Sequence, residues 1–287
     1  MNMKKIIKSN PGRSAIGNIG NFIFLAIFGL FMILPMIFII SNAFKPLDEL
    51  FMYPPRLFVR NPTTDNFSAL TTVFADSLVP FPRYLFNTVF ITIVTTIGKV
   101  IVATMAGYVL EKKRFPGRNF IFKTVVTAML FTSAVTSIPN YLILSKLGWI
   151  DSYLSIIVPA MGAAFGVFLV KQFMVNIPDT ILEAARVDGA SEHRIFWTMI
   201  IPNVKSAWLT LVIFTVQEMW SVTGGTYIYS EELKTLQTAL SQVVSSGISR
   251  TGVSAAISLI MMIVPIFVFV LSQKNVVETM MSSGIKE

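Results

Sequence analysis

The side chains that most often carry out chemistry in proteins are scarce in this sequence. The 287 residues include no cysteine and a single histidine, His193. These counts exclude disulfide frameworks, cysteine nucleophiles, thiolate metal sites and metal sites built from several histidines. The sequence also lacks the G-x-x-x-x-G-K-S/T phosphate loop, so the chain does not bind ATP as P-loop proteins do. We therefore expect no catalytic residue, no metal and no cofactor on this chain.

The polar residues that stand out lie inside long apolar runs, where a charge is unfavourable. Only Lys99, Lys123 and Glu218 place a charge within these runs. Charged groups at mid-bilayer rarely face lipid, since the charged form costs at least about 2.5 kcal/mol there. Four side chains are expected to face a polar path or a second subunit: Asn140, Gln217, Glu218 and Trp220. The alternative for Glu218 is an interhelical hydrogen bond or an ion pair with Lys99, whereas Lys123 is expected to snorkel to the interface.

The long connection at residues 171–206 carries enough structural signals to be folded. Residues from Thr180 to Glu183 fit a capping box at the start of a helix with an apolar face. Gly189 is expected to end that helix, because a glycine just past a helix takes the left-handed conformation. The sequence therefore predicts a short amphipathic helix followed by a bend.

A second short helix is expected to start at Ser191, a good N-cap residue, and to run to Pro202. Two interpretations of the helix pair are open. Phe196 and Trp197 suit a unit that lies passively on the membrane interface. Small and charged residues around the bend suit a docking surface for a cytoplasmic partner: Glu183, Ala184, Ala185, Arg186, Asp188, Gly189 and Ala190. Periodicity does not choose between the two.

Composition and apolar runs predict an all-α integral membrane protein with six transmembrane helices. Hydrophobic residues make up 54% of the chain and charged residues 13%, whereas soluble domains average about 25% charged. A helix needs about 20 largely apolar residues to cross a bilayer. Six runs have roughly this length: Asn21–Ala43, Tyr84–Leu110, Asn119–Leu144, Leu154–Val170, Ala207–Thr226 and Val253–Ser272.

Several prolines and glycines are expected to change the shape or the packing of these helices. Pro35, Pro139 and Pro265 are expected to kink or break their helices. Gly162 and Gly166 form a small-xxx-small pair that lets the fourth helix pack closely on a neighbour. The sequence shows no internal repeat or linker, so residues 1–287 are expected to form a single membrane domain that includes the loop at 171–206.

Basic residues predict the orientation of the chain. Fourteen lysines and arginines lie in four segments on one side, at residues 1–20, 111–118, 171–206 and 273–287. Seven lie on the other side, at residues 43–83, 145–153 and 223–252. The positive-inside rule then places both termini in the cytoplasm of a multi-pass cell-membrane protein. In a membrane chain a basic excess sets topology, so no nucleic-acid partner is expected.

The run "EAARVDGASEHRIFWTMIIP" at residues 183–202 resembles the EAA loop of ABC-importer permeases. That pattern has Glu-Ala-Ala, three residues, Gly, nine residues and Ile-x-Leu-Pro. The residues that match in register are Glu183, Ala184, Ala185, Gly189 and Pro202. Met199 and Ile201 occupy the Ile and Leu positions. The longer run "IPDTILEAARVDGAS" is similar to the carbohydrate-uptake branch, although Thr180 stands where that branch usually has an acidic residue. The chain resembles the smaller inner-membrane permease of maltose-type importers.

The resemblance implies a type I ABC-importer permease for a carbohydrate such as an oligosaccharide, a transport subunit and not an enzyme. It also implies a heterodimer with a second permease, two cytoplasmic ATPase subunits that bind ATP and Mg, and an extracytoplasmic solute-binding protein. The loop at 171–206 would be the coupling loop, and its seven docking residues would contact an ATPase. The alternative, a secondary transporter driven by an ion gradient, predicts inverted repeats and several intramembrane acids, whereas the sequence has one such acid and no repeat.

Overall fold

The computed structural model describes residues 15–75, 79–162, 164–247 and 250–283, and every regular element in this part of the chain is a helix. The all-α membrane architecture is therefore confirmed. Four helices are long and apolar enough to cross a membrane, and six spans result if each of two bent helix pairs counts as one. Much of the basic segment 1–20, which contributes to the orientation argument, lies outside the described residues.

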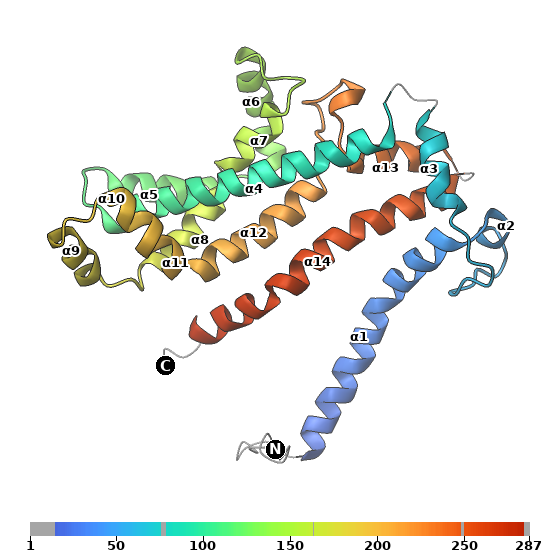
Figure 1. Cartoon of the computed structure of the whole chain (residues 1–287), viewed down its shortest axis with the longest axis horizontal. Helices are drawn as coiled ribbons and strands as arrows, with labels where there is room; N and C mark the ends of the chain where they lie inside the picture. Colours follow the sequence, from blue (N-terminus) through green and yellow to red (C-terminus); the bar gives the residue numbers. More distant parts are fainter. Residues whose placement is uncertain (1–14, 76–78, 163, 248–249, 284–287) are drawn as a thin grey trace.

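Helix α4 (Phe81–Lys112) is the central element of the bundle (Figure 1). Three other helices pack along it: α7 (Leu154–Met161), α8 (Ala164–Met174) and α12 (Lys205–Trp220). The main apolar core lies between α4, α8 and α12, and it continues into the connection between α8 and α12. Whatever moves α4 must therefore also act on α8 and α12, because close-packed cores transmit strain.

The predicted close packing of small residues holds for one glycine of the pair. A Cβ atom on Gly166 would lie 3.2 Å from Ala103 Cβ of α4 and 3.2 Å from Leu211 Cδ2 of α12. Gly162 has no neighbour on another helix within 4 Å, and it instead ends α7. Gly166 is thus the position where α8 approaches α4 and α12, while Gly162 is the C-cap residue of α7.

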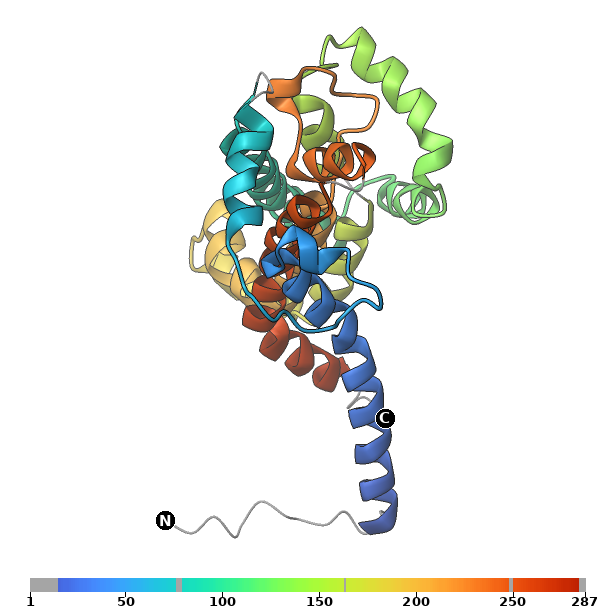
Figure 2. The same ribbon diagram turned by 90° about the vertical axis from the view of Figure 1, so that its right-hand side faces the viewer.

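Helix α1 (Ala15–Phe44) extends away from the rest of the bundle (Figures 1 and 2). It meets α14 (Thr251–Ser283) near its C-terminal end, where Ala43 is buried together with Ala255 and Leu259. Most of its apolar surface is exposed within this chain. That surface is left for lipid or for another protein chain to cover.

Two helix pairs are sharply bent, the first within the predicted span Asn119–Leu144 and the second just before the predicted span Ala207–Thr226. Helices α5 (Arg118–Ala128) and α6 (Ser133–Lys146) meet at 112°, and the helical segment 192–203 meets α12 at 76°. Of the two outcomes expected for Pro139, a kink or a break, the structure contradicts the break, because Pro139 lies inside α6 and the helix is interrupted at residues 129–132, which contain neither Pro nor Gly. Pro35 and Pro265 likewise lie inside α1 and α14 without ending them. Membrane helices tolerate such prolines where neighbouring groups satisfy the freed carbonyls.

The smaller elements gather at the N-terminal end of α4. They are α2 (Leu47–Leu50), α3 (Asp65–Ala75), the 3-10 turn η2 (Glu231–Leu233) and α13 (Leu236–Ser245). Asn87 of α4 donates hydrogen bonds to the backbone oxygens of Glu232 and Lys234, both 2.8 Å, and so holds the connection after α12 at this end. The connection between α8 and α12 packs at the other end of α4 (Figure 1).

Candidate functional site

The connection between α8 and α12 is folded as predicted, as two helical arms joined at a glycine. The first arm is α9 (Asp179–Val187), and Gly189 follows it with a φ of 79°, in the left-handed region. The Ser191 hydroxyl accepts a hydrogen bond from Arg194 N and caps α10 (Glu192–Ile195). The second arm continues through a π-helical turn, η1 (Phe196–Ile200), and α11 (Ile201–Asn203). The predicted bend and the second N-cap are confirmed.

The predicted capping box of Thr180 and Glu183 is absent. Helix α9 begins at Asp179, with Pro178 as its N-cap residue and no side-chain cap. Thr180 therefore lies inside the helix, whereas a capping box needs its Ser or Thr at the N-cap position. The Asp179 carboxylate takes part at this end instead, by accepting a hydrogen bond from Lys112 Nζ at 2.8 Å, which lowers the pKa of Asp179. Glu183 is exposed, and no hydrogen bond or ion pair joins its side chain to another described residue.

Glu192 ties both arms of the loop to the end of α4. Its carboxylate accepts hydrogen bonds from the Tyr108 hydroxyl at 2.6 Å and from Arg186 Nε at 2.9 Å, and it pairs with the Lys113 ammonium group. The hydrogen bonds from Lys113 and then Tyr108 lower the pKa of Glu192 from 4.5 to about 2. Tyr108 and Lys113 lie at the C-terminal end of α4, and Arg186 lies on α9. We call these four residues the loop latch.

A second link joins the start of α9 to α4. Lys112 Nζ donates to the backbone oxygen of Ile177 at 2.6 Å as well as to Asp179. Leu182 of α9 and Ile195 of α10 are both buried in the apolar core that includes α4, α8 and α12. The loop is therefore anchored to the bundle by polar contacts at its rim and by apolar contacts beneath.

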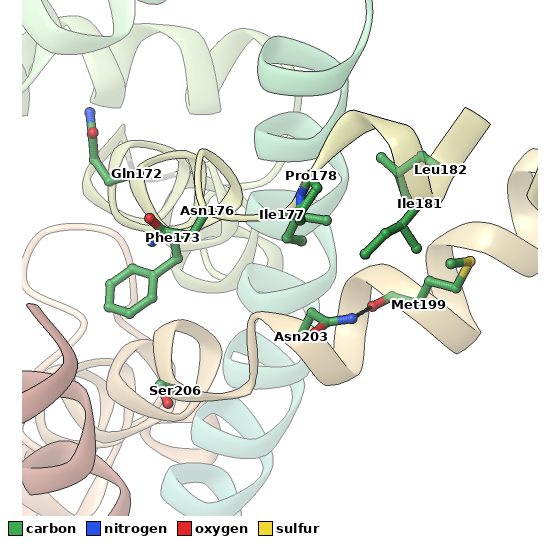
Figure 3. Close-up of a pocket in the computed structure, with 10 residues that line it drawn as sticks. All are labelled: Gln172, Phe173, Asn176, Ile177, Pro178, Ile181, Leu182, Met199, Asn203 and Ser206. Carbon is green, nitrogen blue, oxygen red and sulfur yellow. Dashed lines mark hydrogen bonds between the residues drawn. The ribbon is translucent and has the colours of Figure 1, made fainter. Parts of the chain in front are cut away.

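A cavity of about 680 Å³ separates α9 from the second arm (Figure 3). Ile181 and Leu182 line it from α9, and Met199 lines it from the second arm. The other lining residues come from the end of α8, the segment after it, α11 and α12: Gln172, Phe173, Asn176, Ile177, Pro178, Asn203 and Ser206. Because the cavity lies between them, the two arms are joined at the Gly189 bend and the loop latch, not along their lengths.

The outward face of α9 is uncovered. Glu183, Ala184, Asp188 and Gly189 are exposed, and Val187 is 87% exposed. The other three predicted docking residues, Ala185, Arg186 and Ala190, are half-buried against the bundle. Small, acidic and apolar side chains thus lie together on this face without cover from the described chain. We call Glu183, Ala184, Val187, Asp188 and Gly189 the outer face of α9.

Inside the bundle, Lys99 of α4 and Glu218 of α12 form an ion pair with a Nζ to Oε2 distance of 2.8 Å. The Lys99 side chain is 5% exposed and that of Glu218 is 55% exposed, so the protein encloses the ammonium group while the carboxylate reaches the surface. On the same face of α4, the hydroxyls of Thr92, Thr95 and Thr96 are buried without a hydrogen-bond partner. The structure therefore shows the ion pair with Lys99 that the sequence names as one possibility for Glu218.

The remaining predicted path residues are placed differently from one another. Gln217 is exposed beside Glu218. Trp220 is buried, and its Nε1 donates to the backbone oxygen of Met261 on α14 at 2.9 Å, so it packs between helices and not on an open face. Asn140 lies on α6, which does not pack along α4 or α12 in the described chain, so it is not brought to the Lys99–Glu218 pair.

Three of the latch residues, Tyr108, Lys113 and Glu192, do not stand out in the sequence. One signal does point to them. The segment at 111–118 is strongly basic, and Glu192 is an acid in the first turn of a helix on the same predicted side of the membrane. Opposite charges on two loops of one side favour a contact, but this signal does not say which acid meets which base.

Comparisons with known proteins agree on one family. The family model described as "Binding-protein-dependent transport system inner membrane component" matches residues 12–281. A polygalacturonan/rhamnogalacturonan transport system permease protein of Bacillus subtilis (strain 168) is 29% identical, over 78% of this chain and 77% of that protein. An sn-glycerol-3-phosphate transport system permease protein of Pectobacterium atrosepticum is 29% identical, over 72% of this chain and 75% of that protein.

A solved structure has the same fold. It is one chain in the crystal structure of a bacterial ABC transporter involved in the import of the acidic polysaccharide alginate. The two chains superpose with a TM-score of 0.80 at 25% identity, and the match covers 92% of this chain and 99% of that one. The bent helix pairs and the uncovered helix α1 thus occur in a chain that matches a chain of a solved transporter over 92% of its length.

Proposed function

The chain belongs to the family of binding-protein-dependent transport system inner membrane components, and from this premise we propose that it is the carbohydrate permease subunit of an ATP-driven importer in the cell membrane. It is a transport component of an ABC importer and not an enzyme. The observation that carries the proposal is the connection between α8 and α12, where a family motif coincides with an exposed helix face anchored to the bundle. Family membership leaves the alternative of an ion-gradient transporter without support.

We propose that the outer face of α9 docks into a cleft of an ATPase subunit. Closure of the ATPases on ATP and Mg displaces α9 as a rigid body, and hydrolysis returns it. The loop latch passes this displacement to α4, because Glu192 is bonded to Tyr108 and Lys113 at the end of that helix. Ala185, Arg186 and Ala190 face the bundle and attach α9 to it, so they serve the same coupling from the inner side.

The assembly that we propose contains a second permease in a heterodimer, two ATPase subunits and an extracytoplasmic solute-binding protein. The exposed apolar surfaces of α1 and α6 support a permease partner beside this chain, since lipid and a second membrane subunit are the environments that cover such surfaces. ATP and Mg belong to the ATPase subunits in this proposal.

The proposed orientation places the loop latch and both termini in the cytoplasm. The basic residues of α4's C-terminal end, Lys112 and Lys113, then lie on the side that the positive-inside rule assigns to them. Glu218, with its half-exposed carboxylate, and its neighbour Gln217 are proposed to line the translocation path or meet the second permease. The buried ammonium group of Lys99 forms an ion pair with the Glu218 carboxylate.

The substrate class follows from the relatives by analogy. One relative is named for polygalacturonan and rhamnogalacturonan, and the structural neighbour takes part in the import of alginate. We therefore propose an oligosaccharide as the substrate and expect acidic oligosaccharides to be the first to test.

Purification from native membranes tests the proposal directly. A tagged chain should bring down a second permease and an ATPase. In proteoliposomes, the complex should import oligosaccharides from polygalacturonan or alginate only with ATP on the cytoplasmic side and the binding protein outside. Uptake that follows an ion gradient without ATP, or a purified chain free of any ATPase, would contradict the proposal.

A further inference from the structure

The basic segment at 111–118 and the first turns of α5 carry positive charge that the chain does not neutralise. No acidic residue lies between Glu111 and Asp151 in the sequence. Arg114 and Lys123 are both exposed, and no hydrogen bond or ion pair joins the side chain of either to another described residue. The other basic residues here are paired: Lys112 with Asp179, Lys113 with Glu192 and Arg118 with Glu111.

The acids near this segment already have partners. The charge of Arg114 reaches the Asp179 carboxylate, but that carboxylate accepts a hydrogen bond from Lys112 at 2.8 Å. Glu111 is shared between Arg118 and Lys171 of α8. The start of α5 is therefore a surface with excess positive charge, which attracts anions.

Two open hollows follow one another along α5. The first has a volume of about 400 Å³, and we call it the basic hollow. Its lining residues are Arg114, Phe115, Gly117, Arg118, Asn119 and Phe120. The second has a volume of about 350 Å³, and we call it the apolar groove. Its lining residues are Phe120, Lys123, Thr124, Thr127, Ala128 and Phe131. Because Phe120 lines both hollows, the charged part of this surface meets the apolar part at one aromatic ring.

The apolar groove is less polar than its two threonines suggest. The Thr124 hydroxyl donates to the backbone oxygen of Phe120 at 3.0 Å, and the Thr127 hydroxyl donates to that of Lys123 at 2.9 Å. Both hydroxyls are thus satisfied within the helix. The groove presents methyl groups and aromatic rings, and its cation, Lys123, can bring its ammonium group to the interface on an apolar stem.

The groove lies on the side of α5 that the bundle does not cover. Phe122 stacks on Phe168 of α8, with ring centroids 6.4 Å apart and planes 7° from parallel, and Val125 packs against the main core. At 3.6 residues per turn, the groove residues lie on the opposite face of the helix. No residue of α5 is buried, and Phe120 is 75% exposed. The occupant of this face must therefore come from outside the described chain.

We propose that the basic hollow and the apolar groove together bind one anionic phospholipid of the cytoplasmic leaflet. Its phosphate lies between Arg114 and Lys123, and one acyl chain follows α5. From Phe120 to Ala128 the helix rises about 12 Å, close to half of a bilayer core of about 30 Å. Basic pockets at the cytoplasmic ends of membrane helices suit anionic head groups. The inference rests on the proposed function for the orientation, which puts the start of α5 on the cytoplasmic side.

The joined hollows favour a lipid over two simpler occupants. An apolar helix of another subunit would cover the groove but would bring no anion to Arg114 and Lys123. Inorganic phosphate would meet the basic hollow and leave the groove open. An anionic phospholipid matches both parts, because its charged and apolar parts are covalently joined, as the two hollows are joined at Phe120.

The test uses the permease complex as purified from membranes, in phosphatidylcholine nanodiscs with a trace of phosphatidylglycerol that carries a photoreactive acyl chain. The readout is the labelled fraction of the α5 peptide by mass spectrometry. One variant combines Arg114→Gln with Lys123→Gln, and its control is Lys146→Gln. Lys146 is also exposed and unpaired among the described residues, but it lies at the far end of α6.

A second variant, Phe120→Ala, removes the ring between the two hollows. Its control is Leu130→Ala, since Leu130 is 80% exposed and lines neither hollow. Unlabelled phosphatidylglycerol, phosphatidylcholine and inorganic phosphate are compared as competitors in the wild-type complex.

Labelling of α5 should fall roughly fivefold for each charge removed and should also fall in Phe120→Ala, while both controls keep the wild-type level. Only phosphatidylglycerol should compete. Unchanged labelling in the charge variant would overturn the inference, as would equal competition by phosphatidylcholine or competition by inorganic phosphate. Absence of label on α5 would also overturn it and leave this face to a second subunit. The label needs neither ATP nor sugar, so a complex that imports no oligosaccharide contradicts the proposed function alone.

Discussion

Glu192 accepts donors from α4 and α9, two helices that are far apart in the sequence, and the consequences of changing it follow from those contacts. Gln at this position still accepts a hydrogen bond from Tyr108 but loses the attraction to Lys113 and Arg186. We expect Glu192→Gln to assemble with the ATPases and hydrolyse ATP, while the substrate moved per ATP falls several-fold because α9 no longer drives α4. Uptake and hydrolysis measured on the same proteoliposomes give this ratio.

The control is Glu232→Gln at the other end of α4, where no ion pair joins the Glu232 side chain to another described residue. An equal loss of coupling in both variants would contradict the role of the loop latch.

The pKa of Glu192 also determines the pH range in which the loop latch is stable. Because its folded value of about 2 lies below 4.5, the latch is fully charged above pH 4.5, and its stabilising effect is lost only as the pH falls from there towards 2.

The Lys99–Glu218 pair predicts strong coupling between two substitutions. Glu218→Gln leaves the buried Lys99 charge without its carboxylate, so we expect a loss of roughly 1–3 kcal/mol of stability, less than for a fully buried pair because Glu218 is half-exposed. The double variant Lys99→Met, Glu218→Gln should recover most of this loss. Thermal unfolding of the purified complex with Glu218→Gln, with Lys99→Met and with both substitutions measures the three effects, and simple additivity of the two single effects would contradict the pairing.

For single residues, the sequence predicts a contact best where the contacting residue is close along the chain. Gly189 and Ser191 are predictable because a bend and a cap depend on a few neighbouring residues. Glu192 is not, because Tyr108 lies 84 positions away and any acid of the loop can meet any base of the 111–118 segment. The capping box is absent for a local reason. Pro178 is the N-cap residue and the helix begins at Asp179, so Thr180 lies inside the helix.

At the scale of elements, the bend between α9 and α10 is the feature most open to a test. Gly189→Val forces a branched side chain into a left-handed backbone, which costs about 1–2 kcal/mol, and places it where the ATPase is proposed to dock. We expect a permease that is inserted in the membrane but has lost or uncoupled its ATPase, with uptake abolished.

Gly148→Val is the matched control for this substitution. Gly148 also has a positive φ, 68°, and open space around it, but it lies in the connection between α6 and α7 at the other end of the bundle. Uptake should survive this equal backbone strain. If both variants lose uptake to the same degree, strain and not docking explains the effect, and the coupling role of the bend falls.

The elements themselves are largely predictable, and their breaks are not. All six apolar runs correspond to helices, since length and hydropathy decide whether a segment crosses a membrane. The break between α5 and α6 falls at residues 129–132, where no proline or glycine marks it, while Pro139 lies inside α6. Helix propensity depends only on the residues of the helix itself. A break within a bundle also depends on packing against neighbouring helices, and the sequence does not show which helices pack together.

For the whole molecule, the orientation can be tested cleanly because the chain has no native cysteine. A cysteine in place of Asp65 should react with an impermeant maleimide in intact cells, since residue 65 is exposed on the proposed extracytoplasmic side. A cysteine in place of Lys113, in the basic segment at 111–118, should react only after the membrane is opened. The reverse pattern would invert the topology and with it the assignment of the outer face of α9.

The ion pair inside the bundle also has a consequence for how the chain is made. Glu218 follows Lys99 by 119 residues, so at about 5–20 residues per second a ribosome needs roughly 6–24 s to supply the carboxylate after the ammonium group has been synthesised. During that interval α4 must enter the membrane with an unpaired lysine. Its 32 residues are apolar enough to carry one such charge. The ion pair therefore forms only after α12 has been synthesised, and a chain that stops before α12 retains Lys99 without its carboxylate partner.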